Sequence, residues 1–162
     1  MQSIVTTTED IETQRLGRVI GETFTGGEIL LLIGSLGAGK TKLTQGIAYG
    51  LDVKEYTKSP SFVLVNEYLG RLPLFHMDLY RIEHPKEVLL LGIDDYISDS
   101  SVVVVEWGDR GRPEFPSDHL TINIKVISED VRQLVFDSWG VSSDLSLKRI
   151  MERWDSLDAS GG

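Results

Sequence analysis

The spacing of apolar positions predicts a helix near the start of the chain. Its apolar residues recur every three or four positions: Leu16, Val19, Ile20 and Phe24. Thr7 or Thr8 is expected to cap this helix, with Glu9 and Asp10 in its first turn. Gly26-Gly27 should end it, because two successive glycines favour a turn over a helix.

Two continuous apolar runs predict strands that are buried on both faces of a sheet. They are residues 28–33 (EILLLI) and residues 101–106 (SVVVVE). After the first of them, a second helix that ends near Gly50 is expected from an apolar stripe: Leu43, Ile47 and Leu51.

Alternating segments predict two antiparallel hairpins, each across a short polar turn. They pair residues 62–68 with 72–77, and residues 120–127 with 131–136. Residues 88–91 predict one or two helical turns after Pro85. A closing amphipathic helix is expected from the spacing of its apolar residues: Leu147, Ile150, Met151 and Trp154. The sum indicates an α/β fold with a mixed sheet, because the strands of a hairpin cannot be parallel.

Composition limits the classes to which the chain can belong. Its 162 residues suit one domain. We expect a domain at residues 1–140, with residues 141–162 as a helix and tail that either complete it or dock a partner. The absence of cysteine excludes disulfides and thiolate chemistry. No apolar run suits a signal or a membrane span, so a cytoplasmic location is expected. The net charge of −9 disfavours direct binding of nucleic acid.

A glycine-rich sequence directly follows the first buried run. Residues 34–41 (GSLGAGKT) match the phosphate-binding pattern G-x-x-x-x-G-K-[ST] at every fixed position. Glycines let successive backbone N–H groups surround phosphates, and the following helix points its N-terminus at the same place. Lys40 is then expected to reach the β- and γ-phosphates, and the Thr41 hydroxyl to bind Mg²⁺. With the mixed sheet, this motif predicts a three-layer fold like that of P-loop NTPases.

Acidic residues at the ends of two later strands are candidates for the chemistry. Glu106 ends an apolar strand, as the Mg²⁺-binding acid of P-loop proteins does. His76 and Asp78 share one face of a strand if that strand reaches residue 78. Asp78 either positions water or caps the turn that follows it. His76 is more typical of a satisfied core histidine than of a base.

Several fragments together resemble the bacterial TsaE family, also called YjeE. They occur in the family's order and spacing: SLGAGKT in the glycine-rich loop, SPSFVLVNEY at residues 59–68, HMDLYR at 76–81, LLGIDDY at 90–96 and VVVVEW at 102–107. The resemblance spans roughly residues 11–132. It implies an ATPase subunit of the machinery that makes N6-threonylcarbamoyladenosine in tRNA beside the anticodon. Family members act on the TsaB–TsaD pair, so contact with tRNA would be indirect.

The resemblance also implies roles for individual residues, with ATP and Mg²⁺ as the ligands. Thr41 and Glu106 would bind the metal, and Asp78 matches the family's functionally important acid. Residues 59–62 would form a switch-like segment near the γ-phosphate. Asp78, Lys40 and Glu106 are the expected catalytic residues. Nucleotide binding is expected from the loop, the start of its helix and two distant residues: Gly34, Leu36, Gly37, Ala38, Gly39, Lys40, Thr41, Lys42, Asp10 and Arg132.

Alternatives to ATP hydrolysis stay open on the sequence. A small-molecule kinase uses the same phosphate loop, but the sequence has no arginine-rich lid of the usual kind. An adaptor that binds nucleotide without hydrolysing it would need only the binding residues. Hydrolysis by the isolated chain should be slow, since no arginine finger is evident; Arg81, Arg110 and Arg132 are the candidates. Trp107 fits either core packing or contact with the nucleotide.

Overall fold

A computed structural model describes residues 1–55 and 64–160 of the chain. Within these ranges three α-helices occur, α1 (Asp10–Thr23), α2 (Lys40–Gly50) and α3 (Val141–Ala159). Four short 3₁₀ segments are also present: η1 (Pro85–Leu91), η2 (Ile93–Asp95), η3 (Gly108–Arg110) and η4 (Arg112–Glu114). The strands are β1 (Gln2–Thr7), β2 (Ile29–Ile33), β3 (Val65–Leu69), β4 (Pro73–Asp78), β5 (Val102–Glu106), β6 (Leu120–Val126) and β7 (Arg132–Ser138).

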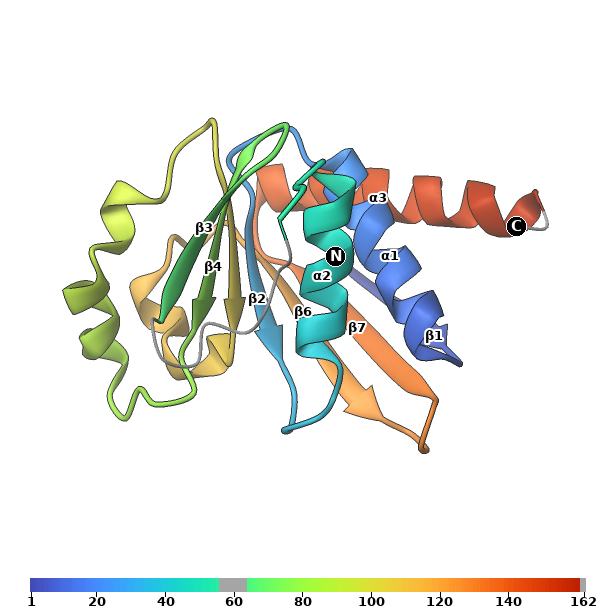
Figure 1. The fold of residues 1–162 in the computed structure, drawn as a ribbon, viewed down its shortest axis with the longest axis horizontal. Coiled ribbons are helices and arrows are strands. Elements are labelled where there is room, and N and C mark those ends of the chain that lie inside the picture. Colours follow the sequence, from blue (N-terminus) through green and yellow to red (C-terminus); the bar gives the residue numbers. More distant parts are fainter. Residues whose placement is uncertain (56–63, 161–162) are drawn as a thin grey trace.

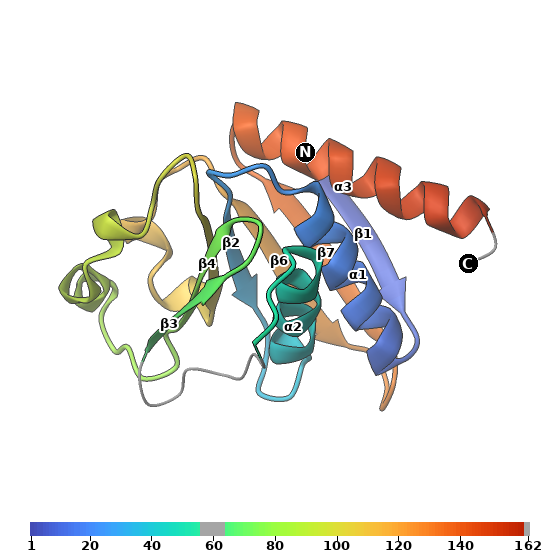
Figure 2. The ribbon, with the colours of Figure 1, turned by 45° about the horizontal axis from the view of Figure 1, so that its top comes forward.

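The strands form one mixed sheet in the order β1-β7-β6-β2-β5-β4-β3. Its centre is parallel, since β2 pairs in parallel with β5 and β6, and β4 with β5. Its edges are antiparallel, because β3 pairs with β4, and β7 pairs with both β6 and β1. The expected α/β class and mixed sheet are therefore confirmed. The helices α1 and α2 lie together over the sheet, and α3 runs along its β1–β7 side (Figures 1 and 2).

Alternate residues of the central strands enter two separate cores. Leu30 and Leu32 of β2 join the core that also holds buried side chains of all three α-helices. Leu31 points the other way, into a second core with Val105 and side chains of the 3₁₀ segments. The apolar runs of β2 and β5 follow from this arrangement, because a strand covered on both faces needs apolar residues at every position.

Helices α1 and α2 pack closely at glycines. A Cβ added to Gly46 would lie 2.1 Å from the Gln14 carbonyl oxygen, and one added to Gly17 would lie 2.3 Å from that of Leu43. Gly21 and Gly50 allow the same approach one turn further along. Backbone therefore lies against backbone along this contact, which fixes the start of α1 relative to the start of α2.

The bounds of the α-helices and strands follow the sequence predictions, except that one strand and three 3₁₀ segments (η2, η3 and η4) are not predicted and one helix cap is corrected. Strand β1 is not predicted, and it holds Thr7 in a pair with Arg132 of β7. Thr7 is buried and shares a 2.7 Å hydrogen bond with the Thr13 hydroxyl, so it is not the helix cap. Glu9 is the N-cap of α1, and the Thr8 N–H instead donates to the Glu12 carboxylate. In the described ranges no helix has the length and apolar character needed to cross a membrane.

Candidate functional site

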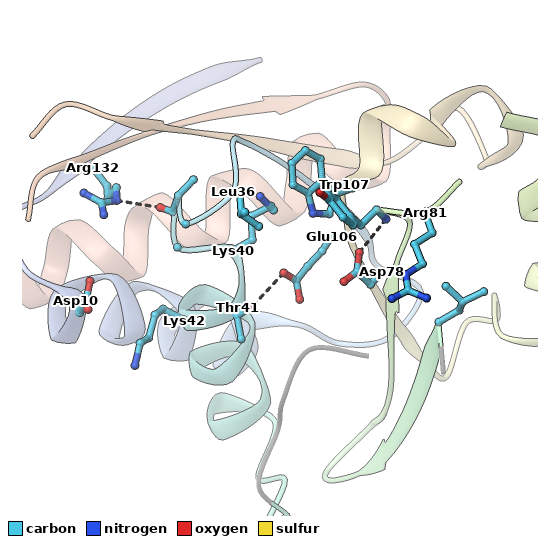
Figure 3. A pocket seen from close by; sticks show the side chains of 15 residues that line it. Asp10, Leu36, Lys40, Thr41, Lys42, Asp78, Arg81, Glu106, Trp107 and Arg132 are labelled. Atoms are coloured by element: carbon cyan, nitrogen blue, oxygen red, sulfur yellow. Dashed lines mark hydrogen bonds between the residues drawn. The ribbon is translucent and has the colours of Figure 1, made fainter. Parts of the chain in front are cut away.

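A cavity of about 590 Å³ opens at the ends of the parallel strands, beside the glycine-rich loop (Figure 3). This is the edge at which α/β proteins bind ligands, since loops there leave the sheet in different directions. The cavity is lined by residues from the loop, α1, α2, β4, β5, β7 and the segments that follow them: Asp10, Leu36, Gly37, Ala38, Gly39, Lys40, Thr41, Lys42, Leu64, Asp78, Tyr80, Arg81, Glu106, Trp107 and Arg132.

The loop between β2 and α2 has the backbone of a phosphate cradle. Gly37 and Gly39 have φ values of 79° and 110°, a left-handed conformation that favours glycine. Gly39 is the N-cap of α2, so the helix begins at Lys40 with its N-terminus at the cavity. Free N–H groups and the positive end of the helix dipole suit an anion there. Gly34, also expected to bind nucleotide, does not line the cavity, and its carbonyl instead accepts from Lys40.

Lys40 is held inside the loop that it follows. Its ammonium donates to the carbonyl oxygens of Gly34 and Ser35, at 2.7 and 2.8 Å. The same nitrogen lies 4.1 Å from the centre of the Trp107 ring, within range of a cation–π contact. Burial lowers the pKa of Lys40, although the charges of Glu106 and Asp78 oppose that shift. The lysine is thus a buried cation at the mouth of the phosphate cradle.

Two side-chain oxygens meet at the start of α2. The Thr41 hydroxyl donates to Glu106 Oε1 at 3.1 Å. Register explains why Glu106 is there: it pairs with Leu32 of β2 on one side and with Asp78 of β4 on the other. A hydroxyl and a carboxylate beside a phosphate cradle form a donor set that suits Mg²⁺. The residues present therefore fit the metal that the sequence predicts.

Asp78 and His76 project from β4 on the face that carries Glu106. Asp78 lines the cavity, and its Oδ1 accepts a hydrogen bond of 2.9 Å from the Tyr80 N–H. Asp78 therefore caps the turn that follows it, and its side chain still lines the cavity. His76 is 1% exposed, and its Nε2 lies 2.5 Å from Glu106 Oε2. The spacing of the sequence does not predict this contact, because the two residues are 30 positions apart.

The opposite end of the cavity is formed by Asp10, Lys42 and Arg132 (Figure 3). Asp10 and Lys42 are exposed at the starts of α1 and α2. The Arg132 side chain is held by backbone carbonyls of other residues. Its Nε donates to the Ala38 carbonyl at 2.9 Å, and a terminal guanidinium nitrogen donates to the Ser128 carbonyl at 2.8 Å. The structure therefore brings all three predicted residues to the cavity that holds Lys40.

Two aromatic side chains, Tyr80 and Trp107, form the wall of the cavity near Lys40. The Tyr80 and Trp107 rings lie 5.0 Å apart, and the Arg110 guanidinium lies 5.1 and 4.9 Å from their centres. Trp107 packs against the second core and also lines the cavity, so its core packing is confirmed and its contact with a nucleotide stays a prediction. Tyr80 and Leu64 are lining residues that the sequence motifs do not single out. Arg81 lines the cavity, whereas Arg110 stacks behind its aromatic wall.

Two sequence expectations lie elsewhere. Residues 40–71 hold five basic and three acidic side chains, an excess that predicts a basic cluster around the phosphates. Arg71 does not join such a cluster, because it donates to the carbonyls of Gly21 and Phe24 at the end of α1. Arg71 therefore caps the C-terminal end of α1, where the last carbonyls of a helix lack backbone partners. The switch-like segment expected at residues 59–62 lies outside the described residues.

Known proteins resemble this chain over most of its length. The family model for threonylcarbamoyl adenosine biosynthesis protein TsaE matches residues 7–134. The chain belongs to the TsaE family. The "tRNA threonylcarbamoyladenosine biosynthesis protein TsaE" of a Nostoc species is 44% identical over 126 residues, which cover 75% of this chain and 76% of that protein.

A relative and a solved structure from Bacillus subtilis show the same likeness. The protein of that name from Bacillus subtilis is 38% identical over 130 residues, covering 80% of this chain and 81% of its own. The crystal structure of Bacillus subtilis YdiB matches with a TM-score of 0.82 at 31% identity, over 94% of this chain and 95% of that one. The predicted family and fold are thus confirmed, and the TsaE match extends across the loop, Asp78 and Glu106.

Proposed function

We propose that this chain binds ATP with Mg²⁺ and hydrolyses it, as a subunit required for N6-threonylcarbamoyladenosine modification of tRNA next to the anticodon. The observation that carries the proposal is the convergence of the glycine cradle, Lys40 and the Thr41–Glu106 pair on one cavity. The relatives support the biological role, since they are named for threonylcarbamoyladenosine biosynthesis in tRNA.

Most of the catalysis would come from positioning and charge. The loop N–H groups would hold the phosphates, and Lys40 would exchange its two carbonyl partners for phosphate oxygens. Mg²⁺ held by Thr41 and Glu106 would neutralise charge on the β- and γ-phosphates. Asp78, fixed by the Tyr80 N–H, would orient the attacking water. The Trp107 ring, whose centre lies 4.1 Å from the Lys40 ammonium, would shield one side of this end from water.

The partners that we propose are TsaB and TsaD, with tRNA reached only through them. An acidic chain with net charge −9 is a poor ligand for tRNA phosphates, so the RNA would be held by the partners. We propose a cytoplasmic site of action for the same assembly. Helix α3 would complete the ATPase domain, because Leu147 and Ile150 are fully buried in the helical core.

The proposal is tested by ATP turnover of the chain with and without TsaB and TsaD. Slow hydrolysis alone and stimulation by the pair are expected. K40A should lower stimulated turnover at least 100-fold, because a preorganised charge contact of this kind is worth about that much. K42A is the comparison variant, since Lys42 is exposed at the other end of the same cavity. At saturating ATP it should change turnover less than threefold, because a loss there would affect mainly the apparent affinity for ATP. No stimulation, with K40A unchanged from wild type, would overturn the proposal.

Two product assays separate the alternatives. Phosphate transferred to an added small acceptor, in place of free phosphate, would indicate a kinase. Full tRNA modification over many turnovers with a non-hydrolysable ATP analogue would indicate an adaptor in which bound nucleotide only sets the conformation. A hydrolysing subunit predicts free phosphate and no sustained modification with the analogue.

A further inference from the structure

The contact between His76 and Glu106 lies beneath the proposed metal site. Both side chains are almost fully buried, at 1% and 4% exposure. Nε2 of His76 lies 2.5 Å from Glu106 Oε2, while Glu106 Oε1 accepts from the Thr41 hydroxyl. The two carboxylate oxygens therefore have different partners, and each partner restricts rotation of the carboxylate.

The remaining nitrogen of His76 shows that this histidine is not simply a satisfied core residue. Nδ1 is buried and has no hydrogen-bond partner among residues 1–55 and 64–160. Burying a polar atom without a partner is unfavourable, and a leucine in β4 would avoid it. The contact made by the other nitrogen explains why a histidine stands here and not a leucine. Nε2 reaches the carboxylate of Glu106, which is 30 residues away in the chain.

We infer that His76 is a positioning residue, which holds the Glu106 carboxylate so that Oε1 stays beside Thr41 for Mg²⁺ with a bound nucleotide. This inference rests on the proposed function and assigns it a residue outside the cavity lining. An ionised carboxylate only accepts hydrogen bonds, so Nε2 is the nitrogen that donates. Groups behind a metal ligand that orient it in this way commonly change metal affinity 10- to 100-fold when removed.

Two amide variants differ in which imidazole nitrogen they replace. In H76Q, the amide nitrogen occupies nearly the place of Nε2 and retains a donor to Glu106. In H76N, the shorter amide reaches only the place of Nδ1, and Glu106 loses its donor. Each variant is titrated with Mg²⁺ in the presence of a fluorescent ADP, and with Mn²⁺ by electron paramagnetic resonance. ADP binding is also measured in EDTA.

H76N should raise the Mg²⁺ and Mn²⁺ concentrations for half-saturation at least tenfold, and H76Q less than threefold. ADP binding in EDTA should be unchanged in both, because His76 does not line the cavity. In an E106Q background, H76N should add less than twofold, since the group that it positions is already altered. Should H76N not fold, H76L compared with H76Q gives the same test.

The outcomes separate the inference from the proposed function. Metal titrations of H76N and H76L that match wild type, in a chain that binds ADP with Mg²⁺, would overturn the role of His76 alone. A wild-type chain that binds neither ADP nor Mg²⁺-ADP would overturn the proposed function. An equal effect of H76N in the wild-type and E106Q backgrounds would show a structural role unrelated to Glu106, and would also overturn the inference.

Discussion

The two ends of the cavity are built in different ways. At the Glu106 end, Lys40, Asp78 and Glu106 are 5%, 6% and 3% exposed, and each has hydrogen-bond partners in the protein. At the other end, Asp10 and Lys42 are exposed. Arg132 is partly buried and held by backbone carbonyls. One end is therefore organised before any ligand binds, whereas the other depends largely on two exposed side chains.

This difference matches the demands of the proposed reaction. Charge develops at the phosphates, and fixed groups in a dry environment stabilise it with little reorganisation. The remainder of a nucleotide needs only to be held, which exposed and mobile side chains can do. We therefore expect substitutions at the buried end to change the rate of the chemical step, and substitutions at the open end to change mainly apparent affinity.

Among variants that compare the two ends of the cavity, the largest effect is expected from a matched pair of aspartate substitutions. D78N should lower kcat for ATP hydrolysis about 100-fold. The neutral amide binds the attacking water more weakly than a carboxylate does, and it cannot accept a proton from that water. The asparagine oxygen can still accept from the Tyr80 N–H, so the turn should persist. D10N, at the exposed end, should change kcat less than threefold. Steady-state hydrolysis in the presence of TsaB and TsaD checks both, and equal losses in the two variants would contradict the comparison.

A second test moves one end of the cavity relative to the other. In G46A, the new Cβ would lie 2.1 Å from the Gln14 carbonyl and push α1 away from α2. We expect the free energy of unfolding to fall by about 1–3 kcal/mol, as measured by urea denaturation. Because α1 carries Asp10, KM for ATP should rise while kcat stays within threefold. A fall in kcat with unchanged KM would show that the buried end depends on this helix contact.

Y49A is the control for G46A, because Tyr49 lies on α2 and is 62% exposed. It should lower the free energy of unfolding by less than about 1 kcal/mol, mainly through loss of its contact with Arg18. An equally large loss in Y49A would assign the G46A effect to α2 itself and not to the glycine contact.

Much of the fold was predictable because burial on two faces leaves a strong local signal. The apolar runs of β2 and β5 identify central strands within a residue or two. Strand β1 (QSIVTT) lacks that signal, since only Val5 and Thr7 are buried in it. Its identity as a strand comes from pairing with β7, more than a hundred residues away. The sequence of the short segment alone does not indicate a pairing with a strand so far away in the chain.

The site divides in the same way. The glycine-rich loop is local, so its residues and their roles could be predicted together from one motif. Asp78 and Glu106 could be named as strand-end acids, but their adjacency depends on the register between β4 and β5. The bond from His76 to Glu106 and the lining position of Tyr80 arise only from tertiary packing. Spacing along the chain carries no information about either contact.

The smallest predicted effect concerns the stability of the nucleotide-free protein. Burial lowers the pKa of Lys40 below its ordinary value of 10.5, so the folded state disfavours the ammonium that the unfolded state exposes. K40M removes this penalty and should raise Tm by about 2 °C at pH 7. As the pH rises from the lowered pKa of Lys40 to 10.5, the wild-type protein should gain stability relative to K40M. In that pH range the unfolded chain binds more protons than the folded chain does.

Thermal unfolding by circular dichroism in EDTA, from pH 7 to pH 10, measures this difference. The Tm gap between K40M and wild type should narrow as pH rises, while K42M, altered at an exposed lysine, should show no gap at any pH. A lower Tm for K40M at pH 7 would mean that the bonds from Lys40 to Gly34 and Ser35 outweigh its burial. The buried end would then be organised by stabilising contacts, and not held ready at the expense of stability.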